Sequence, residues 1–330
     1  MMATLDFLRY RTRLTGLPVF FMKNYTSFHS KKKYRLFVRL FLLIVIVSLL
    51  ALFAWWGLSI WKKTLTKTPA QVNVLELWKN GNYDEILAHS KEELKVHPLD
   101  SGALIFSGFS AFQKGLSETS EEMKAKLVNQ SIIDLRKALL ISNSPLKPQI
   151  HYILGKAYFQ KGKYYADESI TQLNEALAMG YKATDINEYL GLDYNVLGRY
   201  QDAAKFFLKA VKTSNSDVLI WTLGQTYFQI GDMDKATEYL LKALNLTKDN
   251  SLEQRIRFLL GSIYRKLKNY DLATLQYQEI LKKNPNSADA YYYLGEIQSS
   301  LGNKVMARSY WRKAFRIDPL HFNANQRLFN

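Results

Sequence analysis

The sequence contains no cysteine. This absence excludes disulfide bonds, thiolate zinc sites, iron–sulfur ligation and a lipid anchor on a cysteine. A chain without free thiols suits an oxidising compartment. Proline and glycine are also scarce, with 7 and 16 residues in a chain of 330. Because both residues interrupt helices, their scarcity favours a chain that is mostly helical.

Residues that usually form catalytic or metal sites are not grouped in the sequence. There is no glycine-rich phosphate loop and no motif that would activate a nucleophilic Ser or Thr. The acid pair Glu121–Glu122 lies in a polar stretch that is typical of a solvated surface. The histidines lack the spacing of metal ligands; they are His29, His89, His97, His151 and His321. The sequence therefore predicts a protein that is not an enzyme and that has no cofactor, metal ion or small-molecule substrate.

The formal net charge of +16 is unevenly distributed. Residues 1–39 contain nine Lys or Arg and one Asp, and residues 40–61 contain no charged residue. The remaining 269 positions hold 36 basic and 28 acidic residues, which is a mild excess. Nucleic-acid binding by this C-terminal part would need a concentrated basic stripe. No such stripe is apparent, so a nucleic-acid partner is not predicted.

The uncharged stretch from residue 40 to 61 reads LFLLIVIVSLLALFAWWGLSIW. As a helix these 22 residues would be roughly 33 Å long, enough for a hydrocarbon core of about 30 Å. Trp55, Trp56 and Trp61 would lie at headgroup level. Basic residues are denser before the stretch than after it, which predicts a cytoplasmic N-terminus. The sequence thus predicts a single-pass protein of the cell inner membrane, with its C-terminal part periplasmic or otherwise extracytoplasmic.

A cleavable signal peptide is the alternative interpretation of this stretch. Signal peptides have an apolar core of about 7–15 residues followed by small residues at the cleavage site. The stretch is longer than that, and Trp55 and Trp56 occupy the place where small residues would be needed. An uncleaved transmembrane helix is therefore favoured. Met22 is a second candidate start beside Met1.

A repeat with a mean period near 34 residues occupies most of the remaining chain. In its best copy, a Leu-Gly pair at Leu294–Gly295 is followed by Ala307, Ala314 and Pro319. Five such units are predicted, and they span 148–183, 184–216, 217–253, 254–287 and 288–321. Two degenerate units precede them in residues 67–147, with an insertion near 116–126. A linker at 62–66 and a C-terminal cap at 322–330 complete the predicted organisation.

Each unit is predicted to form two amphipathic helices joined by a tight turn, because apolar residues recur at helical spacing in both halves. Gly198, Gly231 and Gly302 stand where a left-handed residue would end the first helix. Small residues at Gly295 and Ala307 would let the two helices approach closely. No proline falls between 149 and 284, as expected if these segments are helix interiors.

In spacing and residue type these units resemble the tetratricopeptide repeat, a helix–turn–helix unit of 34 residues. The resemblance covers residues 67–321 and is strongest from 148 onward. It departs from the family pattern at Asn187, Lys248 and Arg257. The resemblance implies an all-α fold, a right-handed solenoid of about 5–7 repeats that would follow the transmembrane helix. It also implies a concave groove, lined by the first helix of each unit, that receives peptides or partner helices.

The resemblance further implies which residues face this groove. They form an aromatic ladder with few polar groups, which suits an apolar peptide or an amphipathic helix. The alternative that the ladder only packs between repeats, with the convex face as the working surface, stays open. Capture of a C-terminal carboxylate is not predicted, because the needed cluster of Lys, Asn and Arg is missing. The predicted groove residues are Tyr152, Lys156, Phe159, Trp221, Gln225, Phe228, Phe258, Arg265, Tyr292 and Glu296.

These observations predict a membrane-anchored scaffold or adaptor in the cell envelope. It would bind protein partners through the concave groove and the membrane through its transmembrane helix. The alternative from a different class is a membrane-tethered, chaperone-like holdase for exported polypeptides. The sequence identifies neither the partner nor the oligomeric state.

Overall fold

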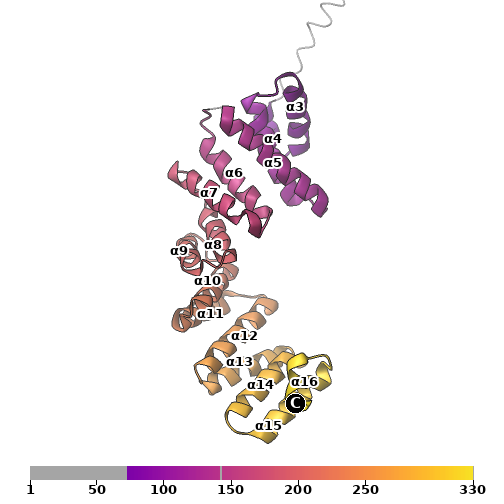
Figure 1. Ribbon diagram of the computed structural model, residues 1–330, viewed down its shortest axis with the longest axis vertical. Helices are drawn as coiled ribbons and strands as arrows, with labels where there is room; N and C mark the ends of the chain where they lie inside the picture. The colour runs from indigo at the N-terminus through magenta and orange to yellow at the C-terminus, as the bar shows by residue number, and fades with distance from the viewer. Residues whose placement is uncertain (1–72, 142, 330) are drawn as a thin grey trace, which may run out of the picture. The chain divides into compact units, whose positions relative to one another are not determined.

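A computed structural model of the chain describes residues 73–141 and 143–329 (Figure 1). This part of the chain is helical throughout, with one short 3-10 turn, η1, and no strand. The helices are α2 (Val74–Lys79), α3 (Tyr83–Val96), α4 (Ser101–Ser117), α5 (Glu121–Ile141), α6 (Lys147–Gln160), η1 (Lys163–Tyr165), α7 (Ala166–Ala178), α8 (Ile186–Val196), α9 (Tyr200–Ala210), α10 (Asp217–Ile230), α11 (Met233–Leu246), α12 (Asn250–Lys266), α13 (Tyr270–Lys283), α14 (Ala288–Ser300), α15 (Lys304–Ile317) and α16 (Phe322–Phe329).

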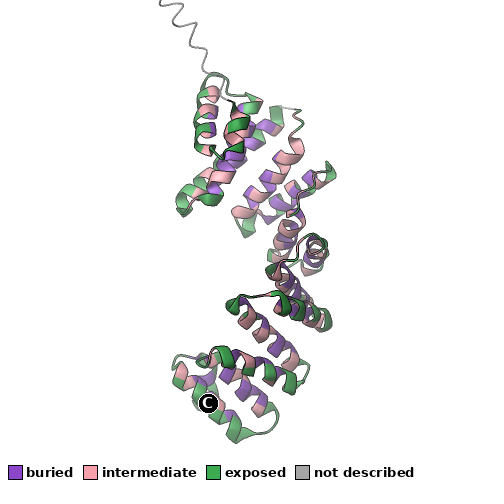
Figure 2. Cartoon of the chain, turned by 180° about the vertical axis from the view of Figure 1, so that it is seen from behind, coloured by how far each residue is buried: buried purple, intermediate pink, exposed green. Residues whose placement is uncertain are grey.

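Consecutive helices pack as antiparallel pairs. Extensive contacts join α4 to α5, α6 to α7, α8 to α9, α10 to α11, α12 to α13 and α14 to α15, and α3 also packs extensively on α4. The first helix of each pair also packs on the second helix of the pair before it, and α16 packs on α15 in the same way. Buried residues lie on the helix sides that face these neighbours (Figure 2). The described part of the chain is therefore an all-α solenoid in which each pair buries its apolar face against adjacent pairs.

Glycine in the first helix lets the two helices of a pair approach closely. A Cβ atom on Gly295 would lie 2.5 Å from Cδ1 of Trp311, the large buried residue of α15. A Cβ on Gly191 would meet the ring of Phe207 at 2.5 Å, and one on Gly261 would meet Tyr277 at 2.6 Å. These distances are shorter than real Cβ contacts, so only glycine fits. The predicted close approach at Gly295 is confirmed.

The turns between paired helices confirm the predicted left-handed conformation of three glycines. Gly198, Gly231 and Gly302 all have positive φ values, of 76°, 91° and 83°. At Gly231 the chain leaves α10, and the backbone N–H of Asp232 donates to the carbonyl of Tyr227 at 3.0 Å. The same turn after α12 is made by Lys268, with φ of 59°, although lysine tolerates that conformation poorly.

The predicted insertion and the predicted C-terminal cap are both largely helical. The segment near 116–126 contains the end of α4, a short turn and the start of α5, which at 21 residues is longer than its partner. The chain after His321 forms α16, an eight-residue helix whose Ala324 is buried against the last pair.

The prediction of a transmembrane helix needs correction. Among residues 73–141 and 143–329, no helix is long and apolar enough to cross a membrane. The stretch 40–61, like the whole of residues 1–72, lies outside the described residues. The predicted fold class, a membrane helix followed by a right-handed solenoid, is thus corrected to an all-α solenoid. The predicted single-pass location in an inner membrane, with periplasmic repeats, is corrected with it because it rested on that helix.

A carboxyl group of α8 is buried between repeats. Asp193 of α8 is 2 % exposed, and its Oδ2 lies 2.5 Å from Oγ of Ser169 in α7. The same Ser169 hydroxyl lies 2.8 Å from the carbonyl oxygen of Gly155 in α6. A hydroxyl has a single proton to donate. If Ser169 donates to Gly155, a protonated Asp193 completes the chain of hydrogen bonds by donating to Ser169.

The pKa of Asp193 agrees with this geometry. Burial raises the pKa to about 7; the hydrogen bond with Ser169 opposes the rise and the charge of Asp167 adds to it. The folded state therefore binds a proton that the unfolded state has released above about pH 4.

We expect Gly295→Ala to lower the free energy of unfolding by about 1–3 kcal/mol, because the added methyl group overpacks the contact with Trp311. Gly102→Ala is the matched control, since its Cβ would meet only Oδ1 of Asp100 at 3.4 Å, an ordinary contact. Urea denaturation of both variants measures the difference. Equal stability of the two variants would show that the glycine contact is not a tight constraint.

We expect the stability of the protein to fall as pH rises through about 7. Because the folded pKa of Asp193 is raised, its contribution is complete below the unfolded pKa near 4 and is lost as pH passes the folded value. Asp193→Asn keeps a donor for Ser169 and removes the titration. Thermal unfolding between pH 5 and 8.5 should therefore show a shallower pH dependence in this variant, and equal slopes would contradict the assignment.

Candidate functional site

The predicted groove residues lie on the first helices of successive pairs, in three regions with different surroundings. The first region joins α6 to α8 around Lys156. The second joins α10 to α12 around Trp221. The third joins α14 to α16 around Glu296.

In the first region, polar groups of the chain bind one another. The ammonium of Lys156 donates to Oδ2 of Asp185 at 2.9 Å and to the hydroxyl of Tyr152 at 3.1 Å. The Tyr152 hydroxyl donates to both Asp185 oxygens, at 2.7 and 2.9 Å. The ammonium also lies 4.8 Å from the ring centre of Tyr189, whose ring meets that of Phe159 edge-on at 4.9 Å.

The charge of this region is balanced within the chain. Burial lowers the pKa of Lys156, but its hydrogen bonds to Asp185 and Tyr152 outweigh that effect and hold the pKa above its ordinary value. Burial and the bond to Asp185 raise the pKa of Tyr152. At neutral pH, therefore, a charged lysine and a neutral tyrosine share one carboxylate. Lys156 and Tyr152 connect two repeats and have little hydrogen-bonding capacity left for a ligand.

The second region contains an open cavity between α10 and α12. Trp221 and Gln225 of α10 line it from one side, and Arg255 and Phe258 of α12 line it from the other. Leu259 and Ser262 complete the lining, and the volume is about 330 Å³. Three of the predicted groove residues are thus brought together around one hollow, whose lining is half apolar and half polar.

Three cations of α12 lie on aromatic rings in this part of the structure. The guanidinium of Arg255 lies 4.6 Å from the ring centre of Trp221, and the ammonium of Lys266 lies 4.4 Å from that of Phe228. Arg265 lies 5.2 Å from the ring centre of Tyr293 in α14. Within residues 73–141 and 143–329, none of the three cations makes an ion pair. Their charges are therefore available to a ligand.

The third region is covered by the C-terminal helix. Glu296, 8 % exposed, accepts two hydrogen bonds from the guanidinium of Arg327 in α16, at 2.9 and 2.8 Å. The ring of Tyr292 lies 5.2 Å from that of His321, just before α16. Tyr292 also borders a hollow of about 1060 Å³ with Trp311 and Arg327. Arg327 therefore occupies both carboxylate oxygens of Glu296, which are not free to bind a ligand.

Sequence reasoning missed two of the cations and both internal partners. Arg255 and Lys266 occupy the second and thirteenth positions of their unit, which face the groove in the same repeat register that identified Phe258. That register could have found them. Asp185 also occupies the second position of its unit, so the register could have found it as well. Arg327 had no such signal, because it lies in α16, outside the five predicted units.

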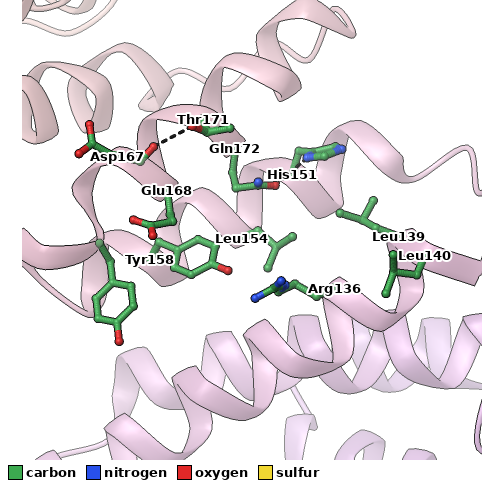
Figure 3. Close-up of a pocket in the computed structure, with 11 residues that line it drawn as sticks. Arg136, Leu139, Leu140, His151, Leu154, Tyr158, Asp167, Glu168, Thr171 and Gln172 are labelled. Carbon is green, nitrogen blue, oxygen red and sulfur yellow. Dashed lines mark hydrogen bonds between the residues drawn. The ribbon is translucent and has the colours of Figure 1, made fainter.

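A further hollow lies between α5 and α7, with α6 as its floor (Figure 3). Its volume is about 700 Å³. Arg136 and Leu140 reach it from α5, and Leu154 and Tyr158 reach it from α6. His151 also borders it, with Nδ1 2.8 Å from Oε1 of Gln172. Because it opens between two second helices, it is separate from the surface formed by the first helices.

We expect Lys156→Met to lower the free energy of unfolding by about 1–3 kcal/mol, because a partly buried Asp185 loses its cation. Gln225→Met is the matched control at the same repeat position; the side chain of Gln225 makes no hydrogen bond to the described residues. It should change stability by less than about 0.5 kcal/mol. If chemical denaturation shows equal losses of unfolding free energy in both variants, Lys156 does not stabilise the fold more than Gln225 does.

Several family models, all of the same kind of repeat, match parts of this chain. A model described as "TPR repeat" matches residues 261–302. Models described as "Tetratricopeptide repeat" match residues 166–218, 219–250 and 288–319.

Two curated relatives are similar over part of the chain. The Protein O-mannosyl-transferase TMTC1 of Homo sapiens is 27% identical over 186 residues, covering 56% of this chain and 20% of that protein. The Anaphase-promoting complex subunit 3 of Schizosaccharomyces pombe is 21% identical over 273 residues, covering 79% of this chain and 37% of that protein. The chain thus spans well under half the length of these relatives.

A solved structure supports the fold. The C-terminal part of a TPR repeat-containing protein from Cytophaga hutchinsonii superposes with a TM-score of 0.57 at 18% identity, covering 78% of this chain and 98% of that one. This similarity concerns the fold alone. Together with the helix pairs and the matched residues, it leads to one conclusion: the chain contains tetratricopeptide repeats, arranged as an all-α solenoid.

Proposed function

We propose that this chain is a non-enzymatic scaffold or adaptor that binds segments of partner proteins in the groove between α10 and α12. The observation that carries the proposal is the cavity at Trp221, Gln225 and Phe258. Trp221, Phe258 and Leu259 give it aromatic and apolar surface beside three polar residues, and its volume of about 330 Å³ suits side chains of a bound segment. Aromatic anchors in such pockets dominate the energetics of many protein interfaces.

The other predicted groove residues have different roles in the proposal. Tyr152, Lys156 and Glu296 hold neighbouring elements of the chain together through hydrogen bonds and ion pairs. Phe228 and Arg265 lie beyond the cavity on the same two first helices, and they extend the binding surface along α10 and α12. The proposed binding surface is therefore shorter than the whole ladder.

The relatives support a scaffold role by analogy. One of them is named as a subunit of a larger complex, and its similarity covers most of this chain. Another is named as a transferase, but the similar part is a fifth of that protein. Transferase activity is therefore not part of the proposal.

Photo-crosslinking from the groove tests the function. A photoreactive phenylalanine analogue at Trp221 should give one or a few discrete products in cells, because that side chain borders the cavity. The same analogue at Lys242, exposed on α11, should give none of them. Mass spectrometry identifies the crosslinked chains.

Two outcomes would contradict the scaffold proposal. A smear of many products from Trp221 would indicate transient binding of many unfolded chains, as expected for a holdase. Products from Lys242 with none from Trp221 would place the working surface on the second helices.

A further inference from the structure

We propose that the groove between α10 and α12 selects acidic segments. The partner segment would carry two carboxylates about 15 Å apart, with a large apolar side chain between them that enters the cavity at Trp221 and Phe258. This inference rests on the proposed binding function of the same groove and specifies the chemistry of its partner.

The spacing follows from the positions of the cations on α12. Arg255 lies at the cavity, and Arg265 and Lys266 lie ten and eleven residues further along the same helix. At a rise of 1.5 Å per residue, the two ends of this cationic row are about 15 Å apart. Arg255 and Lys266 contact aromatic rings of α10, so they follow this groove rather than the outer surface. Arg265 contacts a ring of α14, on the next first helix.

Three acidic residues near this row already have partners. Glu253 at the start of α12 pairs with Arg257 and with Lys283. In α14, Asp289 accepts a hydrogen bond from His321, and Glu296 is paired with Arg327. Within the described part of the chain, none of the three cations forms an ion pair with a carboxylate, so their charges can attract an acidic partner.

The aromatic contacts prepare the cations for binding. A guanidinium that stacks on a ring keeps its N–H edges free for a carboxylate. The stacked position of Arg255 on Trp221 also restricts its rotamers before the ligand arrives. Less side-chain entropy is then lost on binding, which increases affinity and fixes where the carboxylate must lie.

The cavity accounts for the apolar part of the segment. Trp221, Phe258 and Leu259 supply apolar surface, while Gln225 and Ser262 offer polar groups to the ligand backbone. The cavity is a third of the way from Arg255 to Arg265, since Phe258 follows Arg255 by three residues. An apolar side chain placed between two acids of the ligand would therefore meet it.

The other regions of the ladder do not share this chemistry. Around α6 and α8 the cation Lys156 is neutralised by Asp185, and around α14 the acid Glu296 is neutralised by α16. Selection for acidic segments is thus localised to α12.

Peptide selection on the full chain tests this inference. A displayed library of random dodecapeptides is panned against the wild type, against Arg255→Glu/Lys266→Glu, and against Lys242→Glu/Arg312→Glu. The last variant carries the same change of charge on exposed residues of α11 and α15. Arg265 is kept because it is half-buried, and urea denaturation verifies that both double variants fold.

The wild type should enrich peptides with two acidic residues flanking a large apolar residue. Synthetic copies of these peptides should bind the groove variant about 100-fold more weakly, at about tenfold per reversed charge. The outer-face variant should bind them within about twofold of the wild type. Replacing both acids of the peptide with Gln should weaken binding to the wild type by a similar factor.

Three results would overturn the inference: enrichment of neutral or basic peptides, equal weakening in both double variants, or no enrichment above that on an unrelated folded protein. Failure of the inference is distinguishable from failure of the proposed function. If Trp221 crosslinks a discrete partner whose attached segment is not acidic, the function stands and the inference fails. If Trp221 gives no crosslink, both fail.

Discussion

The close approach of paired helices at glycine is the constraint on which the rest of this structure depends. Gly191, Gly261 and Gly295 leave room for a large residue of the partner helix, and any side chain at those positions would collide with it. Because that contact sets the distance between the two helices of a pair, it also sets where the first helices stand relative to their neighbours. The groove between α10 and α12 exists because Gly224 and Gly261 hold those helices against α11 and α13.

Repeats with one backbone plan differ in what their polar side chains do. Lys156 and Glu296 stand at the same position of their units, and each forms an ion pair with another residue of the chain. Gln225, at that position of α10, makes no such contact and borders a cavity. The functional surface is therefore set by which polar groups find partners within the solenoid, rather than by the repeat pattern alone.

Sequence periodicity predicted the helix pairs because glycine and alanine recur where the helices touch, and such contacts repeat with the period. It was less informative wherever a contact involves a residue outside the pattern. The turn at Lys268 has the geometry of Gly231 without the glycine. Arg327 reaches Glu296 from a helix that belongs to no complete unit. Asp185 stands at a groove position of its own unit, but the period does not show that it pairs with Lys156 of the unit before. The membrane helix was predicted from an uncharged apolar stretch with flanking tryptophans and basic residues, and no helix of the described residues could span a membrane.

Hydrogen exchange tests the central claim, that the working surface is the groove between α10 and α12. The full chain is compared with and without a saturating amount of the most strongly enriched dodecapeptide. Slower exchange confined to the cavity-lining parts of α10 and α12, with α7 and α15 unchanged, is the predicted result. Protection centred on α7 or α15, or spread evenly along the solenoid, would contradict it.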